Sequence, residues 1–206
     1  MFDYNDTLIL FGRSPFINEI REYIPELIKK YHTMGCNYFC DSFPDVEYVI
    51  FYDDICPKVS ENSTIITNIE HYRNRCKKCY ELCHTHKKIE FYTINRNRFD
   101  LSTGDSRLNF CVHTPSIAFN WALKNGFKNV VIAGIDLIIN TEHFDKDTTP
   151  DQNGPTFNNF AILEAREHLV NVAAKYLKIY QLNPKSDIEL EKITIEELLK
   201  NDFTSV

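Results

Sequence analysis

Residues 114–139 read TPSIAFNWALKNGFKNVVIAGIDLII and decide the fold class. A helix is expected over 116–124, because Thr114 suits the N-cap position and Pro115 the first turn, where a missing N–H is tolerated. The apolar residues of this helix are too dense for a thin amphipathic stripe, which predicts burial on most sides. The dipeptide Asn-Gly at 125–126 favours a left-handed cap that ends the helix.

The second half of this stretch predicts a buried strand. Residues 130–135 form an unbroken apolar run, which is typical of a parallel strand covered on both faces. Gly134 and Asp136 lie at its carboxyl end, where ligands sit in open α/β sheets. We therefore expect a ligand-binding turn at this point.

Outward from this unit, strands alternate with helices along most of the chain. Further strands are expected at 7–11, 35–39, 47–52, 63–67, 89–94 and 177–182. Further helices are expected at 15–31, where Pro25 marks a kink or a second helical segment, at 160–176, and at 193–199. The alternation predicts a single α/β domain over 1–206, with a doubly wound, mainly parallel sheet of the Rossmann-like kind. The segment 140–159 is a candidate lid loop, because long loops are usually lids or disordered.

The composition is that of an ordinary globular protein. The 206 residues are 43% hydrophobic and 25% charged, which is enough for one full core. No apolar run is long enough to predict a transmembrane segment, and the N-terminus lacks the basic start of an export signal, so we expect a cytoplasmic protein. The net charge of −6 argues against general nucleic-acid binding, although a local basic patch at 73–88 is compatible with it. A homo-oligomer remains an open alternative.

Seven cysteines without an export signal are expected to be free thiols. Cys76, Cys79 and Cys83 would share one face of a helix, and His84 and His86 follow them. Cysteine and histidine are ligands that zinc prefers, but the second ligand pair of a usual zinc module is missing. Half-buried thiols, a metal site and redox chemistry are the three interpretations of this cluster.

Two turns carry polar residues directly after expected strands. Gly12, Arg13 and Ser14 feed the start of a helix, which is a ready anion site, although an ordinary βα turn explains them equally well. The pattern matches neither the glycine fingerprint of dinucleotide-binding proteins nor a Walker loop. Asp53 and Asp54 follow the strand 47–52, and paired acids there suit a metal, a ribose hydroxyl or a solvated turn.

Several segments, in the same order, resemble the small bacterial sialyltransferases that use CMP-sialic acid (glycosyltransferase family 42) and related uncharacterised proteins. The segments are LILFGRSP, CNYF, FYDD, IITNIEHY, HTPSIAFNWALKNGFKNVVIAGIDL and LKIYQLNPKS. The resemblance implies a Rossmann-like nucleotide-binding domain with a lid. It also implies inverting transfer of a sialic-acid-like sugar from a nucleotide-activated, CMP-linked donor to a glycan or small-molecule acceptor, with no metal or other cofactor.

Carried over by position, the resemblance implies a set of nucleotide-binding residues. The set is Gly12, Arg13, Ser14, Asn37, Asp53, Asn68, Thr114, Ser116, Gly134 and Asp136. The turn 12–14 would line the phosphate and cytidine, Thr114 and Ser116 would contact the donor sugar, and the turn 134–136 would lie beside the nucleobase and ribose. The family has Asn where Arg13 and Asp53 stand here.

The catalytic residues depart from the family pattern. Ile138, and Glu142 or His143, stand where the family has two phosphate-binding tyrosines. Asn159 stands where it has the histidine that acts as general base. His143, in the candidate lid, is the nearby replacement, because an ordinary histidine pKa suits base catalysis. A solvated loop residue is the alternative interpretation of His143.

Two other functions stay open. The chain could be a degenerate, non-catalytic nucleotide-binding module, which the departures at Ile138 and Asn159 favour. It could also be a pyrophosphokinase-like enzyme, in which carboxylates such as Asp53, Asp54 and Asp136 would hold Mg²⁺.

Overall fold

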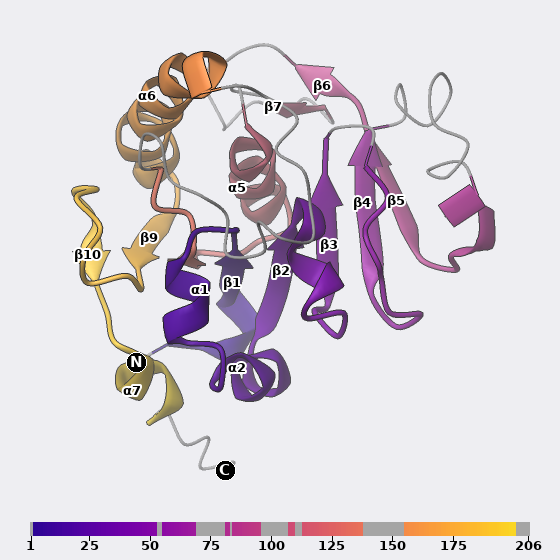
Figure 1. The fold of residues 1–206 in the computed structure, drawn as a ribbon, viewed down its shortest axis with the longest axis horizontal. Coiled ribbons are helices and arrows are strands. Elements are labelled where there is room, and N and C mark those ends of the chain that lie inside the picture. Colours follow the sequence, from indigo (N-terminus) through magenta and orange to yellow (C-terminus); the bar gives the residue numbers. More distant parts are fainter. Residues whose placement is uncertain are drawn as a thin grey trace.

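The main sheet is parallel throughout the part of the chain that the structure describes (Figure 1). This computed structural model describes residues 2–52, 55–68, 81–82, 84–95, 107–109, 113–137 and 155–200, with the backbone alone at 95, 109 and 155–160. Within these ranges, eight strands form one sheet in the order β10-β9-β8-β1-β2-β3-β4-β5. Every neighbouring pair in it is parallel. The predicted α/β class, with a doubly wound Rossmann-like sheet, is confirmed.

Most strands of the main sheet coincide with apolar runs of the sequence. The main sheet comprises β1 (Thr7–Phe11), β2 (His32–Cys36), β3 (Tyr48–Phe51), β4 (Thr64–Asn68), β5 (Ile89–Tyr92), β8 (Asn129–Ala133), β9 (Lys178–Gln181) and β10 (Glu191–Lys192). A separate parallel pair joins β6 (Ile94–Asn95) to β7 (Leu108–Asn109). Neither β7 nor β10 was predicted, because two-residue strands carry almost no pattern.

The helices alternate with these strands. They are α1 (Phe16–Glu19), α2 (Ile24–Lys30), α5 (Thr114–Lys124), α6 (Pro155–Asn171) and α7 (Ile195–Leu199), with 3₁₀ turns η1 (Tyr4–Asp6), η2 (Asn37–Asp41) and η3 (Ala173–Lys175). As expected from the sequence, α7 is a short helix, and Thr194 and Glu197 close a capping box at its start. Among the described residues, no helix has both the length and the hydrophobicity to cross a membrane.

Helices cover both faces of the sheet, and β1 shows why. All five of its residues are completely buried. Leu8 and Leu10 belong to the core that contains α5 and α6, whereas Ile9 and Phe11 belong to the core that contains α1, α2 and α7. Successive side chains of a strand point to opposite faces, so a strand with apolar residues on both faces requires cover on both.

The strand order reverses beside β1. The chain proceeds from β1 through β2, β3 and β4 to β5 on one side, and then returns to β8, which pairs with the opposite edge of β1. The carboxyl ends of β1 and β8 therefore form the topological switch point, where ligands of such sheets bind. We refer to the carboxyl ends of the strands as the rim.

Several element boundaries differ from the prediction. The strand expected over 35–39 ends at Cys36, because Asn37 turns into the left-handed region, with φ of 54°, and begins η2. The helix expected over 15–31 is split into α1 and α2, and Pro25 lies in the first turn of α2. The helix expected over 160–176 begins at Pro155 and ends at Asn171. Residues 155–159 of the candidate lid are thus helical, and 140–154 lie outside the described residues.

The central helix begins at Thr114, the residue predicted as its N-cap. His113, not Thr114, caps α5, because its ring Nδ1 accepts the N–H of Ser116 at 3.1 Å. Gly126 ends this helix with φ of 85°, as expected for its left-handed cap.

Candidate functional site

Backbone contacts join the turns that follow β1 and β8. Gly12 N donates to Ala133 O at 2.8 Å, and Ser14 N donates to Gly134 O at 2.9 Å. A Cβ atom at Gly12 would collide with Gly134 O and would lie 2.6 Å from Ile135 Cγ1. Only glycine at position 12 therefore allows the two turns to meet this closely.

A buried carboxylate lies at this meeting point. Ser14 Oγ donates a short hydrogen bond to Asp136 Oδ2. Asp136 is 3% exposed, and its Oδ1 has no hydrogen-bond partner among the described residues. Leu137 follows with φ of 49°, a conformation that is rare for bulky residues and frequent at functional sites. A buried acceptor without a partner is a candidate acceptor for a hydrogen bond that a ligand donates.

A second contact links β2 to the start of α5. The left-handed backbone of Asn37 directs its side chain across the rim, and Asn37 Oδ1 accepts the hydroxyl of Thr114 at 3.1 Å. Ser116, two residues further on, is completely buried, and its hydroxyl donates to the carbonyl of His113 at 2.7 Å. Thr114 thus faces the rim, whereas Ser116 helps to close the first turn of the helix.

Arg13 lies against an aromatic ring. Its Cζ atom is 5.4 Å from the centroid of the Tyr38 ring, which is within the range of a cation–π contact. Sequence reasoning missed Tyr38, because its contact with Arg13 joins residues that are distant in the sequence.

The remaining predicted residues are less closely joined. Asn68 ends β4 and is 1% exposed. It lies two strands from β2, or about 10 Å along the rim at ordinary strand spacing. Asp53 and His143 lie outside the described residues, and so does the side chain of Asn159, which stands in α6. The roles of these residues stay predictions.

Two histidines lie where α5 and α6 pack together, with His168 buried and His113 half-buried. Burial lowers the pKa of His168 to about 4. Burial, aided by the nearby His168, likewise lowers the pKa of His113 to about 4. Among the described residues, His113 Nε2 and both ring nitrogens of His168 have no hydrogen-bond partner. The two rings are therefore neutral near pH 7.

The cysteine and histidine cluster remains a prediction. His86 Nε2 is 2.7 Å from Ser63 O, whereas Cys76, Cys79 and Cys83 lie outside the described residues. Within the described ranges, no group of three or more His, Cys, Asp or Glu side chains is arranged to hold a metal ion.

Three described cysteines agree with the expectation of free thiols. Cys36, Cys40 and Cys56 form no disulfide. Burial raises the pKa of the Cys36 thiol, so this side chain behaves as a small apolar group and not as a nucleophile.

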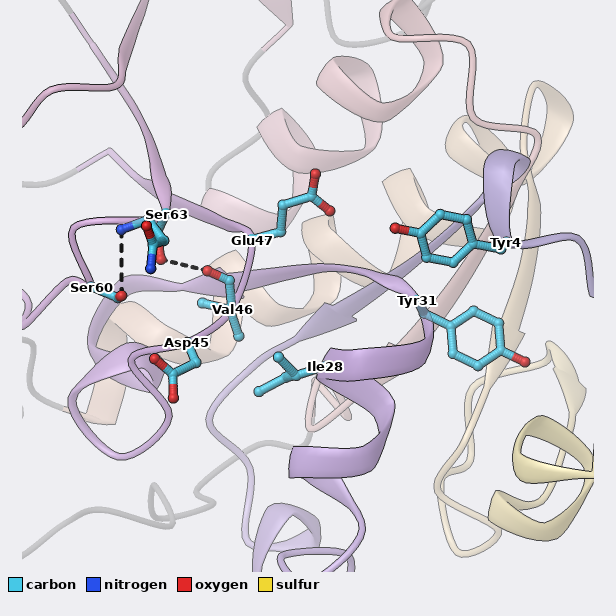
Figure 2. Close-up of a pocket in the computed structure, with 9 residues that line it drawn as sticks. Tyr4, Ile28, Tyr31, Asp45, Val46, Glu47, Ser60 and Ser63 are labelled. Atoms are coloured by element: carbon cyan, nitrogen blue, oxygen red, sulfur yellow. Dashed lines mark hydrogen bonds between the residues drawn. The ribbon is translucent and has the colours of Figure 1, made fainter. Parts of the chain in front are cut away.

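A separate hollow lies at the opposite end of the sheet (Figure 2). It has a volume of about 460 Å³ and is lined by Tyr4, Ile28, Tyr31, Asp45, Val46, Glu47, Ser60, Asn62 and Ser63. These residues directly precede β1, β2, β3 and β4, so the hollow lies at the amino ends of the strands. Ser63 Oγ donates to Val46 O at 2.5 Å on one wall. No predicted site residue lines this hollow.

Comparisons with known proteins bear on the fold. No family model and no curated protein matches the sequence. The solved structure of the MAf glycosyltransferase from Magnetospirillum magneticum AMB-1 is similar, with a TM-score of 0.62 and 11% sequence identity. The match covers 95% of this chain and 34% of that one, so this chain spans about a third of its length. At this identity the likeness supports the Rossmann-like architecture, and membership of glycosyltransferase family 42 stays a prediction.

The first prediction concerns the contact at Gly12. Gly12→Ala is expected to destabilise the fold by about 2 kcal/mol or more, because the new methyl group forces the turns after β1 and β8 apart. Gly126→Ala is the matched control, since it meets no atom within 4 Å and strains only a left-handed φ of 85°; about 1 kcal/mol is expected for it. Denaturant unfolding measures both variants. Equal losses would show that steric contact at Gly12 is unimportant.

The second prediction concerns acid sensitivity. Because the folded-state pKa of His168 is about 4 and the ordinary value is about 6.5, the unfolded chain binds more protons between these limits. The contribution of His168 to the free energy of unfolding is therefore complete above pH 6.5, and it is lost as the pH falls toward 4. His168→Leu should reduce the stability lost between pH 7 and pH 5 by about 1 to 2 kcal/mol.

Denaturant unfolding at the two pH values checks this expectation. His84→Leu, a change at an exposed position, serves as the control and should lose as much stability as the wild type. Equal losses in His168→Leu and the wild type would contradict the neutral, buried state of His168.

Proposed function

We propose that this chain is a glycosyltransferase-like enzyme that transfers a sialic-acid-like sugar from a CMP-linked donor to an acceptor hydroxyl. The observation that carries the proposal is the buried carboxylate of Asp136 at the switch point, held by Ser14 on one oxygen and without a described partner on the other. The likeness in fold to a protein described as a glycosyltransferase supports sugar transfer. The sialyltransferase-like order of motifs supports the choice of donor.

The rim offers a distinct group to each part of such a donor. Asp136 Oδ1 accepts a hydroxyl or amine of the nucleoside, and the tight turn at Gly12 allows the backbone to approach the phosphate. Arg13 binds phosphate oxygens, because a guanidinium matches them in bidentate geometry. Thr114 and Asn37, already joined to each other, border the space where the sugar sits.

The chemistry exchanges one bond at the anomeric carbon. The acceptor oxygen forms a bond to that carbon while the bond from the carbon to the phosphate oxygen breaks, and CMP leaves. A general base takes the proton of the acceptor hydroxyl, and we assign this role to His143. Arg13 and Thr114 stabilise the charge on the leaving phosphate, which is where charge develops in the transition state. No metal is required for these steps.

A second candidate is a nucleotide-binding module without catalysis. It is favoured by Asn159, which occupies the position of the family's base, and by Ile138 in place of a tyrosine. Ligand binding without turnover distinguishes it from the enzyme. The pyrophosphokinase-like alternative, with Mg²⁺ held by carboxylates such as Asp53, Asp54 and Asp136, is distinguished by complete loss of activity in EDTA.

Binding is tested by thermal shift with CMP, CDP, UDP, GDP and ATP. CMP is expected to raise the melting temperature most, because a ligand that binds only the folded state stabilises it. Asp136→Ala should weaken CMP binding at least tenfold, or about 1.4 kcal/mol. Asp45→Ala, an exposed acid in the hollow at the opposite end of the sheet, should leave binding unchanged. If CMP still raises the melting temperature of Asp136→Ala but no longer that of Asp45→Ala, the nucleotide does not bind at the rim.

Turnover is tested by release of CMP from CMP-sialic acid in the presence of acceptor sugars. His143→Ala is expected to reduce turnover at least a hundredfold while CMP affinity stays within about twofold, because the base acts on the acceptor and not on the nucleotide. His84→Ala, a change at an exposed position, is the matched control, and full turnover is expected for it. Unchanged turnover in His143→Ala would remove this residue from the mechanism.

A further inference from the structure

We propose that Tyr38 is a positioning residue that holds the Arg13 guanidinium in place for the phosphate of a bound nucleotide. The inference rests on the proposed function, because it assumes a nucleotide at the switch point between β1 and β8. Tyr38 itself touches no reacting group in this proposal and acts through Arg13. It has no assigned role in the resemblance or in the predicted set.

The support for Tyr38 begins in the core. The rings of Phe11 in β1 and Phe39 in η2 stack with centroids 4.8 Å apart and planes 1° apart, and both side chains are completely buried. Gly35 in β2 makes room for this arrangement, because a Cβ atom there would lie 2.9 Å from Phe39 Cδ1. The 3₁₀ turn η2 is therefore fixed against the end of β1 by close packing.

The contact between Arg13 and Tyr38 extends this packing to the rim. Arg13 follows Phe11 by two residues, and Tyr38 directly precedes Phe39. The contact between Arg13 and Tyr38 therefore lies next to the buried ring pair, on its rim side. Asn37 is the first residue of η2, and its left-handed backbone sets the direction that the chain takes from β2 to Tyr38. Both residues are partly exposed, as a pair that meets a ligand must be.

A ring is a suitable support for an arginine that binds phosphate. The ring face attracts the positive charge, while the five N–H donors of a guanidinium lie in its plane and can reach two oxygens of a phosphate. A side chain held against a ring also loses less conformational freedom when the ligand binds. Tyr38 should therefore strengthen the binding of the phosphate and leave the binding of the nucleoside unchanged.

The test compares CMP, UMP, GMP and AMP with the matching nucleosides by isothermal calorimetry on the full chain. The ratio of the two affinities for the best-bound base isolates the contribution of the phosphate. Arg13→Ala should reduce this ratio at least tenfold, and Tyr38→Ala about three- to fivefold. Tyr38→Phe keeps the ring and should keep the ratio within about twofold. The double variant should match Arg13→Ala, because the ring then has no cation to position.

Arg21→Ala is the matched control. Arg21 stands between α1 and α2 in the sequence, and its Cζ lies 5.3 Å from the centroid of the Phe43 ring. Arg21→Ala therefore removes the same charge from a similar cation–π pair outside the rim. The ratio should be unchanged in this variant.

Two results would overturn the positioning role while nucleotide binding itself stands. One is an unchanged ratio in Tyr38→Ala, which includes equal losses for nucleoside and monophosphate. The other is a loss in Tyr38→Phe as large as that in Tyr38→Ala. Failure of the wild-type protein to bind any of the nucleotides would overturn the proposed function, and this inference with it.

Discussion

The site depends on the close approach of two backbones, at Gly12 after β1 and at Gly134 after β8. Hydrogen bonds from the amides of Gly12 and Ser14 join the two turns, and no side-chain atom of residue 12 stands between them. This approach brings the Ser14 hydroxyl to the Asp136 carboxylate across 122 residues of sequence. Because the chain leaves β1 and β8 toward opposite sides of the sheet, the same two turns also border the crevice in which ligands of such folds bind.

The sequence predicts the sheet well because its central strands, such as β1 and β8, are buried on both faces. The apolar runs at 7–11 and 130–135 have no polar side that could face water, so each strand needs a layer of helices above and below it. The boundaries were less predictable where distant contacts decide them. Thr114 was the better N-cap by preference, but its hydroxyl donates to Asn37, 77 residues earlier, and His113 takes the cap instead.

The sequence proposes the candidate site as a set of residues, and the structure adds contacts between some of them. The pairs Ser14 with Asp136, and Thr114 with Asn37, consist of residues that the motifs had singled out. Tyr38 and His168 were missed, because each gains its importance from a neighbour that is distant in sequence. An arginine over a ring and a desolvated imidazole leave no periodic or spacing signal.

Amide chemical-shift mapping with CMP tests the central claim most directly, because it locates the ligand without any substitution. The largest shifts are expected at the amides of Gly12, Ser14, Asn37 and Gly134, at the carboxyl ends of β1, β2 and β8. Shifts confined instead to Asp45, Asn62 and Ser63, in the hollow at the amino ends of the strands, would contradict a nucleotide site at the rim.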